Sequence, residues 1–220
     1  KAGGVQRERQ INKHSMLEGR LKELSASFAE GAGSPVRKAP ATTFALIAAF
    51  ETIVVSARTK PFMRMYAWYR CLRAWAAMRF DDHRGFVPAQ MRLLVSGLRG
   101  DLVRAKTTGP GNKREQLHIA IDREAFIAEP SWLEVGWGLW VGVHPGRDFF
   151  LGFPLKDLSR ARCMEARYAD AVAMSRALMA ELSDPSGAPL MTEAVTSSFG
   201  TEHSDRAFLP SMAGSMTDID

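Results

Sequence analysis

Two side chains able to grip a phosphate lie three positions apart near the C-terminal end of the sequence, His203 and Arg206 in TEHSDR. Residues three apart on a helix project from one face, so the imidazole and the guanidinium would meet at one point. The planar fork of an arginine binds phosphate oxygens in a bidentate way. A His-x-x-Arg pair alone is common on protein surfaces. Its meaning therefore depends on the cations that the rest of the chain supplies.

Two further cations have an unusual setting. Arg79 lies seven residues after Leu72, and this spacing extends the apolar stripe of a helix predicted from about Pro61 to Arg79. A buried guanidinium needs a partner, which makes an arginine at that place informative. Lys106 lies where a predicted strand meets the Gly-rich turn TTGPGNKRE.

The helix from about Pro61 to Arg79 contains two other arginines. Arg70 and Arg73 fall off its apolar stripe, so we expect them to be solvated. They nevertheless remain alternatives to Arg79 as the functional arginine, and Lys113 remains an alternative to Lys106 in the same turn.

Arg79, Lys106, His203 and Arg206 together could hold one phosphodiester. Two guanidiniums can bind the non-bridging oxygens and neutralise the charge of a pentavalent transition state. A histidine can donate to the same phosphate, and a lysine on a hairpin can protonate a departing hydroxyl as a general acid.

The elements that must position these cations are mostly helical. Thr42 or Thr43 can cap the apolar helix FALIAAFETIVVSA. A β-hairpin is predicted where apolar residues alternate on both sides of the Gly-rich turn. In residue numbers, we expect strands at 98–106 and 116–121, an apolar Trp-rich segment at 130–142, a long helix at 158–182 and a last helix that follows 192. The fold class is therefore mainly α (α+β), with a small antiparallel sheet.

Residues 1–30 fit one amphipathic helix, and residues 31–42, GAGSPVRKAPAT, have the composition of a linker. We divide the chain into an N-terminal helix and linker at 1–36 and a principal domain at 37–220. The start has no initiator Met, and the last residues follow a helix without a natural finish. We therefore expect the chain to be a piece of a longer protein.

The composition excludes several classes of protein. A net charge of +5 and a pI near 9.5 favour an anionic partner such as nucleic acid. No apolar run approaches the length of a transmembrane helix, and the polar start does not resemble a signal peptide. Cys71 and Cys163 lie in apolar helical patterns and are expected to be buried, reduced thiols. His118 and His144 have no acidic or Cys partners at ligand spacing, so neither a metal nor a cofactor is expected.

The order of three motifs resembles the catalytic domain of the tyrosine recombinase (phage-integrase) superfamily, especially the recombinases of eukaryotic mobile elements. The first motif of that family, an Arg followed three residues later by an acid, corresponds to Arg79 and Asp82 in MRFDDHRGFVP. The hairpin lysine corresponds to Lys106 in RAKTTG, and His-x-x-Arg corresponds to His203 and Arg206. The resemblance covers about residues 37–217.

The resemblance implies a nuclear enzyme that breaks and rejoins double-stranded DNA, recombining or integrating a mobile element, with no metal or high-energy cofactor. Arg79 and Arg206 would clamp the scissile phosphate, His203 would assist, Lys106 would act as general acid and Asp82 would brace Arg79. Copies of the protein would associate in a synaptic complex. The residues at 1–36 would be a remnant of the family's DNA-clamping domain.

One part of the family pattern is missing. The family cleaves DNA with a tyrosine after His-x-x-Arg, and the three tyrosines of this sequence all lie upstream, at Tyr66, Tyr69 and Tyr168. Whether the chain by itself is an enzyme stays open. Two alternatives remain: a non-catalytic DNA-binding derivative of this fold, and an unrelated helical protein-interaction module. The Trp132, Trp137 and Trp140 group is interpreted as core rather than as a base-stacking platform.

Overall fold

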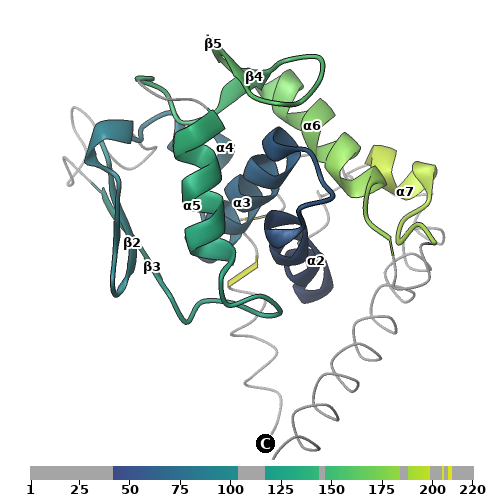
Figure 1. Cartoon of the computed structure of the whole chain (residues 1–220), viewed down its shortest axis with the longest axis horizontal. Helices are drawn as coiled ribbons and strands as arrows, with labels where there is room; N and C mark the ends of the chain where they lie inside the picture. The colour runs from purple at the N-terminus through teal and green to yellow at the C-terminus, as the bar shows by residue number, and fades with distance from the viewer. Residues whose placement is uncertain are drawn as a thin grey trace, which may run out of the picture.

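The structure is a computed structural model that describes residues 42–103, 117–143, 147–183, 188–198, 205, 208 and 209. Within these ranges the fold is mixed α+β, with helices and two small antiparallel sheets (Figure 1). The elements in chain order are α2 (Phe44–Val55), α3 (Pro61–Trp75), α4 (Phe80–His83), the 3-10 turn η1 (Pro88–Gln90), β1 (Arg92–Leu94), β2 (Gly97–Leu102), β3 (Leu117–Asp122), α5 (Trp132–Val143), β4 (Gly152–Pro154), β5 (Ala161–Glu165), α6 (Tyr168–Ala180) and α7 (Glu193–Ser198).

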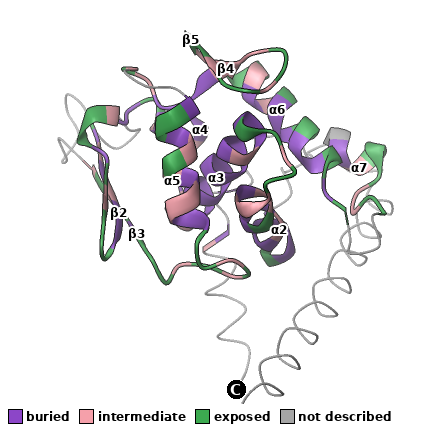
Figure 2. Cartoon of the chain, in the orientation of Figure 1, coloured by how far each residue is buried: buried purple, intermediate pink, exposed green. Residues whose placement is uncertain are grey.

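Helix α3 lies at the centre of the core and is buried along most of its length, as Figure 2 shows. Helices α2 and α5 pack against it, and α6 contacts it from another side. The apolar residues of α3 meet the aromatic side chains of α5 and of the segment after it: Trp68 packs against Trp140 and Phe150. The interpretation of the Trp-rich segment as core is confirmed for Trp132 and Trp140, which are both buried.

Local signals explain where the first two helices begin. The Thr43 side chain accepts a hydrogen bond from the Leu46 amide and caps α2, as the sequence predicts. Pro61 occupies the first position of α3, where its missing N–H costs nothing. Helix α3 ends at Trp75, earlier than predicted, because the chain turns through Ala77 in the left-handed region at φ 50. Only a short turn then separates α3 from α4.

The three-stranded sheet has the order β1-β2-β3. Strands β2 and β3 pair antiparallel in continuous register, from Gly97 opposite Asp122 to Leu102 opposite Leu117. The predicted β-hairpin is confirmed for these two strands, although β2 ends before Lys106. A short strand, β1, adds to its outer edge and was not predicted.

The segment before α6 differs from the prediction. Instead of one helix over 158–182, β4 and β5 form a second antiparallel sheet, and the helix α6 begins only at Tyr168. Leu158 turns between the strands at φ 58. Cys163 lies on β5 and is exposed, so its prediction as a buried thiol is wrong, whereas Cys71 is buried as expected. The apolar residues of 158–167 are too few to cover a helix face.

Candidate functional site

Arg79 was predicted to extend the apolar stripe of α3. This prediction is wrong, because α3 ends before Arg79. It occupies the residue before α4, in extended conformation at φ −80 and ψ 163. Its backbone N–H donates to Asp82 Oδ2 at 2.7 Å. Asp82 therefore caps the short helix, and it fixes the Arg79 backbone rather than the guanidinium.

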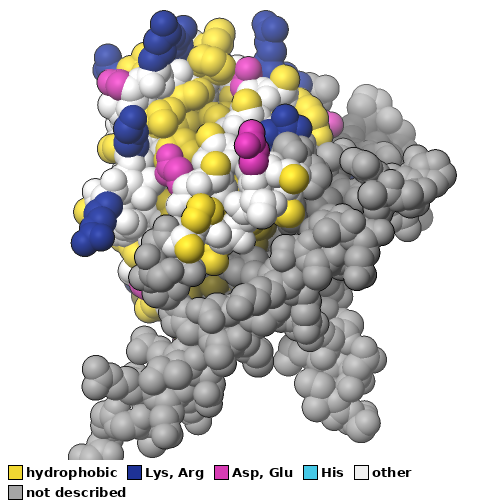
Figure 3. Space-filling view, turned by 90° about the vertical axis from the view of Figure 1, so that its right-hand side faces the viewer, with side chains coloured by type: hydrophobic (Ala, Val, Ile, Leu, Met, Phe, Trp, Pro, Cys, Tyr) yellow, Lys and Arg dark blue, Asp and Glu magenta, His cyan; other side chains and the backbone are white. Residues whose placement is uncertain are grey.

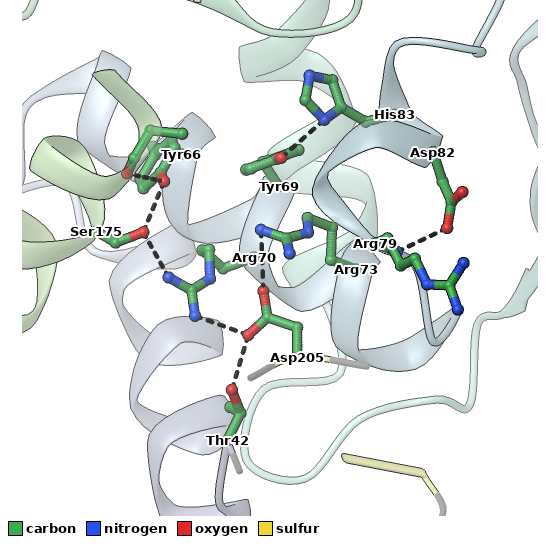
Figure 4. A network of polar contacts seen from close by, with 11 residues as sticks. Thr42, Tyr66, Tyr69, Arg70, Arg73, Arg79, Asp82, His83, Ser175 and Asp205 are labelled. Atoms are coloured by element: carbon green, nitrogen blue, oxygen red, sulfur yellow. Dashed lines mark hydrogen bonds and ion pairs between the residues drawn. The ribbon is translucent and has the colours of Figure 1, made fainter. Parts of the chain in front are cut away.

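The Arg79 side chain is half-buried. Figure 4 shows its guanidinium directed away from the buried polar cluster on α3. Within the described part of the chain it forms no ion pair. As far as the described residues go, Arg79 thus presents a cation without an ion-pair partner at the α3–α4 corner, by which we mean residues 73–86.

The two arginines that were expected to be solvated are buried. Arg70 is 1% exposed and Arg73 is 0% exposed. Both meet Asp205, whose carboxylate is also fully buried: Arg70 Nη2 donates to Oδ1 at 2.7 Å, and Arg73 Nη1 lies 3.3 Å from Oδ2. The prediction failed because the anion that compensates them comes from a position more than a hundred residues further along the chain.

Further polar contacts complete the cluster around Asp205 (Figure 4). The Thr42 hydroxyl, just before α2, donates to Asp205 Oδ1 at 2.7 Å. Burial alone would raise the pKa of Asp205, but the charges of Arg70 and Arg73 hold it below its ordinary value. Asp205 is therefore ionised, and it ties the C-terminal motif region to α2 and α3.

The same cluster reaches α6. The Arg70 Nη1 donates to the Ser175 hydroxyl, and that hydroxyl lies 2.7 Å from the Tyr66 hydroxyl. Tyr66 also donates to the Ala171 carbonyl at 2.7 Å. Residues of α3 and α6 are thus linked to Asp205 by one chain of hydrogen bonds.

The hairpin that carries Lys106 begins beside α4. The Val103 amide donates to the Gly85 carbonyl at 3.0 Å, and Phe86 pairs with Leu102. Gly85 lies two residues after α4. The chain three residues before Lys106 is therefore fixed to the α3–α4 corner.

Of the four predicted site residues, the structure describes Arg79. Lys106, His203 and Arg206 lie outside the described residues, as does Lys113. The structure does describe neighbours of all three: Val103 before Lys106, and Asp205 between His203 and Arg206. Both neighbours contact residues of the α3–α4 corner.

Two of the three tyrosines have buried hydroxyls. Tyr66 and Tyr69 are 0% exposed, and the Tyr69 hydroxyl lies 3.0 Å from His83 Nδ1. Tyr168 begins α6 and is 41% exposed; its ring packs edge-on against Phe80, the residue after Arg79. Burial withholds the hydroxyls of Tyr66 and Tyr69 from any substrate.

His83 was not singled out from the sequence, where DDHR has the pattern of a solvated turn. It is buried among Tyr69, Phe80 and Phe150, and its Nε2 has no hydrogen-bond partner among the residues that the structure describes. Burial lowers the pKa of His83 to about 3, and the charge of Arg73 adds to this effect. The ring is therefore neutral at physiological pH and belongs to the wall of the α3–α4 corner.

The other polar features lie apart from these residues. His118 on β3 is exposed and contacts Asp101 on β2, with Nδ1 2.6 Å from Oδ1. No cluster of His, Cys, Asp or Glu among the described residues could hold a metal ion. None of the helices in those same ranges is long and apolar enough to cross a bilayer.

The surface offers little that would hold a small substrate. An open, mainly apolar groove of about 460 Å³ runs along α5 and the start of α3, lined by Pro61, Arg64, Val135, Leu139, Gly142 and Ser159. Its one cation, Arg64, donates from Nε to the Val54 carbonyl. On the face drawn in Figure 3, basic side chains lie along the upper and left margins, around a band of hydrophobic side chains. Neither feature gathers catalytic groups.

Comparison of this chain with models of protein families, with curated protein sequences and with solved structures finds no significant match. The resemblance to tyrosine recombinases therefore rests on the residues of this chain alone.

Proposed function

We propose that this chain is a DNA-binding, DNA breaking-rejoining domain of a tyrosine recombinase, with Arg79, Lys106, His203 and Arg206 acting on one phosphodiester. The observation that carries the proposal is the burial of Asp205 against Arg70 and Arg73. Asp205 belongs to the His-x-x-Arg segment, and Arg73 lies six residues before Arg79. A residue within the third motif thus contacts a residue six positions before the first motif.

The hairpin supports the same arrangement. Val103 and Leu102 pair with Gly85 and Phe86, just after α4. The first, second and third motifs therefore each have a neighbour held at the α3–α4 corner. Contacts of three separate segments with this corner support a shared site.

The charges of the arginines indicate which of them could bind a phosphate. Arg70 and Arg73 are buried and share the carboxylate of Asp205, so they are poor candidates for binding a phosphate. Arg79 has no ion-pair partner in the described ranges and is free to bind an anion. A guanidinium clamp would neutralise the non-bridging oxygens, and a lysine on the hairpin would protonate the leaving hydroxyl. DNA would be held through phosphate contacts, and copies of the protein would pair in a synapse in the nucleus.

The test begins with a duplex selected from a random library for binding to the full chain. Phosphates of that duplex are then neutralised one at a time as methylphosphonates. One position should weaken binding by the wild-type chain by about tenfold, the effect of a charge-assisted contact of about 1.4 kcal/mol.

The variants decide whether the motifs share that phosphate. Arg79→Ala and Arg206→Ala should each lose sensitivity to the same position. Arg176→Ala, which removes an exposed arginine of α6, should keep it. Sensitivity of the two variants to different phosphates, or retained sensitivity in both, would show that Arg79 and Arg206 do not form one clamp.

A further inference from the structure

Asp205 is not alone in contacting the core near the C-terminal motif. Phe208, three residues later, is 1% exposed. Its ring meets Phe44 of α2 edge-on at 5.4 Å between centroids, and Trp75 at the end of α3 at 5.5 Å. The segment is thus fixed at two points, one ionic and one aromatic, on the same pair of helices.

The spacing of these two residues can be compared with that of the functional pair. Asp205 and Phe208 are three apart, and so are His203 and Arg206. In the helix that the sequence predicts here, each residue turns about 100° from the one before. The two pairs then project in roughly opposite directions. If the face with Asp205 and Phe208 packs on the core, the face of the predicted helix with His203 and Arg206 would point away from the core.

We propose that Asp205 is a positioning residue: together with Phe208 it docks the C-terminal motif on α2 and α3, so that His203 and Arg206 face the phosphate. In this arrangement Arg70 and Arg73 bind the Asp205 carboxylate and are not phosphate ligands. The role in phosphate binding rests on the proposed function, whereas the docking itself does not.

The chemistry of the cluster suits this role. The Asp205 carboxylate has a defined direction, because Thr42 and Arg70 donate to Oδ1 while the Arg73 guanidinium lies beside Oδ2. Asparagine has nearly the same shape but no charge, and its amide nitrogen cannot accept a hydrogen bond. Asp205→Asn therefore loosens the dock with little change in volume.

Gly136 provides a control. A Cβ at this position would lie 1.9 Å from Trp68 Cδ1, where α5 packs on α3. Gly136→Ala should therefore weaken the fold, and it changes none of the contacts of Asp205 and Phe208 described above. All measurements are made well below the unfolding temperature of the weakest variant.

The first experiment follows amide hydrogen exchange in peptides that cover 199–209 in the full chain. Asp205→Asn should raise exchange there by about tenfold or more, as expected when a local contact that holds a segment is lost. Gly136→Ala should leave it unchanged. Exchange in 199–209 that is equal in Asp205→Asn and wild type would overturn the docking role, whether or not the chain binds DNA.

The second experiment measures duplex DNA binding against salt concentration. Each phosphate contact contributes about 0.9 to the slope of log affinity against log salt. Arg206→Ala and Asp205→Asn should each lose about one contact, and the double variant should lose no more than either. Gly136→Ala should keep the wild-type slope.

The outcomes separate the two proposals. A wild-type chain that does not bind duplex DNA would reject the proposed function, and hydrogen exchange would still decide the docking. If Arg206→Ala lowers the slope and Asp205→Asn does not, Asp205 stabilises the fold without positioning the motif.

Discussion

At the scale of single residues, arginines that lie close together in the sequence differ in their ionic partners. Arg70 and Arg73 share a buried carboxylate, whereas Arg79 has no ion pair in the described part of the chain. All three lie within ten residues of one another. Only the identity of their partners distinguishes a structural arginine from one that is free to bind an anion.

The buried imidazole of His83 should make stability depend on pH. Its pKa of about 3 in the folded chain lies below the ordinary value near 6.5, so between these values the unfolded state binds a proton that the folded state does not. Stability is thus fully present above about pH 6.5 and is lost as pH falls toward 3. We expect this residue to contribute about 1.4 kcal/mol per pH unit in that window.

Urea unfolding at pH 7, 6, 5 and 4 measures this contribution. His83→Gln should remove most of the dependence between pH 6 and 4. Arg176→Gln, which changes an exposed side chain of α6 that does not titrate in this range, should follow the wild-type curve. Equal curves for wild type and His83→Gln would mean that the imidazole is protonated in the folded state.

At the scale of elements, close approach of α5 to α3 depends on a glycine. A Cβ at Gly136 would lie 1.9 Å from Trp68 Cδ1. Gly136→Ala must therefore displace a buried tryptophan of the central helix, and we expect a loss of about 1–3 kcal/mol in the free energy of unfolding.

Gly138, two residues later on the same helix, meets no atom within 4 Å of such a Cβ. Gly138→Ala should stabilise the chain by about 0.5–1 kcal/mol, because alanine favours the helix. Chemical denaturation of both variants tests the pair. A Gly136→Ala chain as stable as the wild type would contradict the close packing of α5 on α3.

A second link between elements is the carboxylate of Glu51 on α2. It accepts hydrogen bonds from the Ile127, Ala128 and Glu129 amides, in the loop that leads into α5. Glu51→Ala should leave these buried donors unpaired and cost about 2–4 kcal/mol. Glu124→Ala, an exposed change in the same loop region, should cost less than about 0.5 kcal/mol by the same denaturation assay.

Local sequence patterns predicted the helices and strands better than they predicted which side chains form ion pairs. The Thr43 cap, the start of α3 at Pro61 and the pairing of β2 with β3 follow from local patterns and are confirmed. The predicted end of α3 was wrong because Ala77 adopts a left-handed conformation, and the sequence has no glycine at this position to indicate the turn. The burial of Arg70 and Arg73 could not be predicted, because their anion is distant in the sequence.

At the scale of the whole molecule, the cluster around Asp205 joins α2, α3 and α6 to the C-terminal motif. A chain ending at residue 199 would leave Arg70 and Arg73 buried without this anion. We expect such a truncation to lose about 3–5 kcal/mol, the usual cost of breaking a buried ion pair by removing one partner.

A rescue variant separates charge from simple loss of contacts. Replacing both arginines by methionine in the truncated chain removes the uncompensated charges and should recover a large part of the loss. Thermal unfolding of the three chains tests this. If the double methionine variant is no more stable than the truncated chain, the missing charge is not what destabilises it.

The distance in sequence between Asp205 and its two arginine partners also bears on synthesis. A chain that emerges from the ribosome presents Arg70 and Arg73 long before residue 205 has been translated. Until then the central helix carries two cations that the core cannot accept, and domains complete their folding only when their stabilising contacts exist. The ion pairs of the central helix can therefore form only after residue 205 has left the ribosome, so the core is completed late in synthesis of this region.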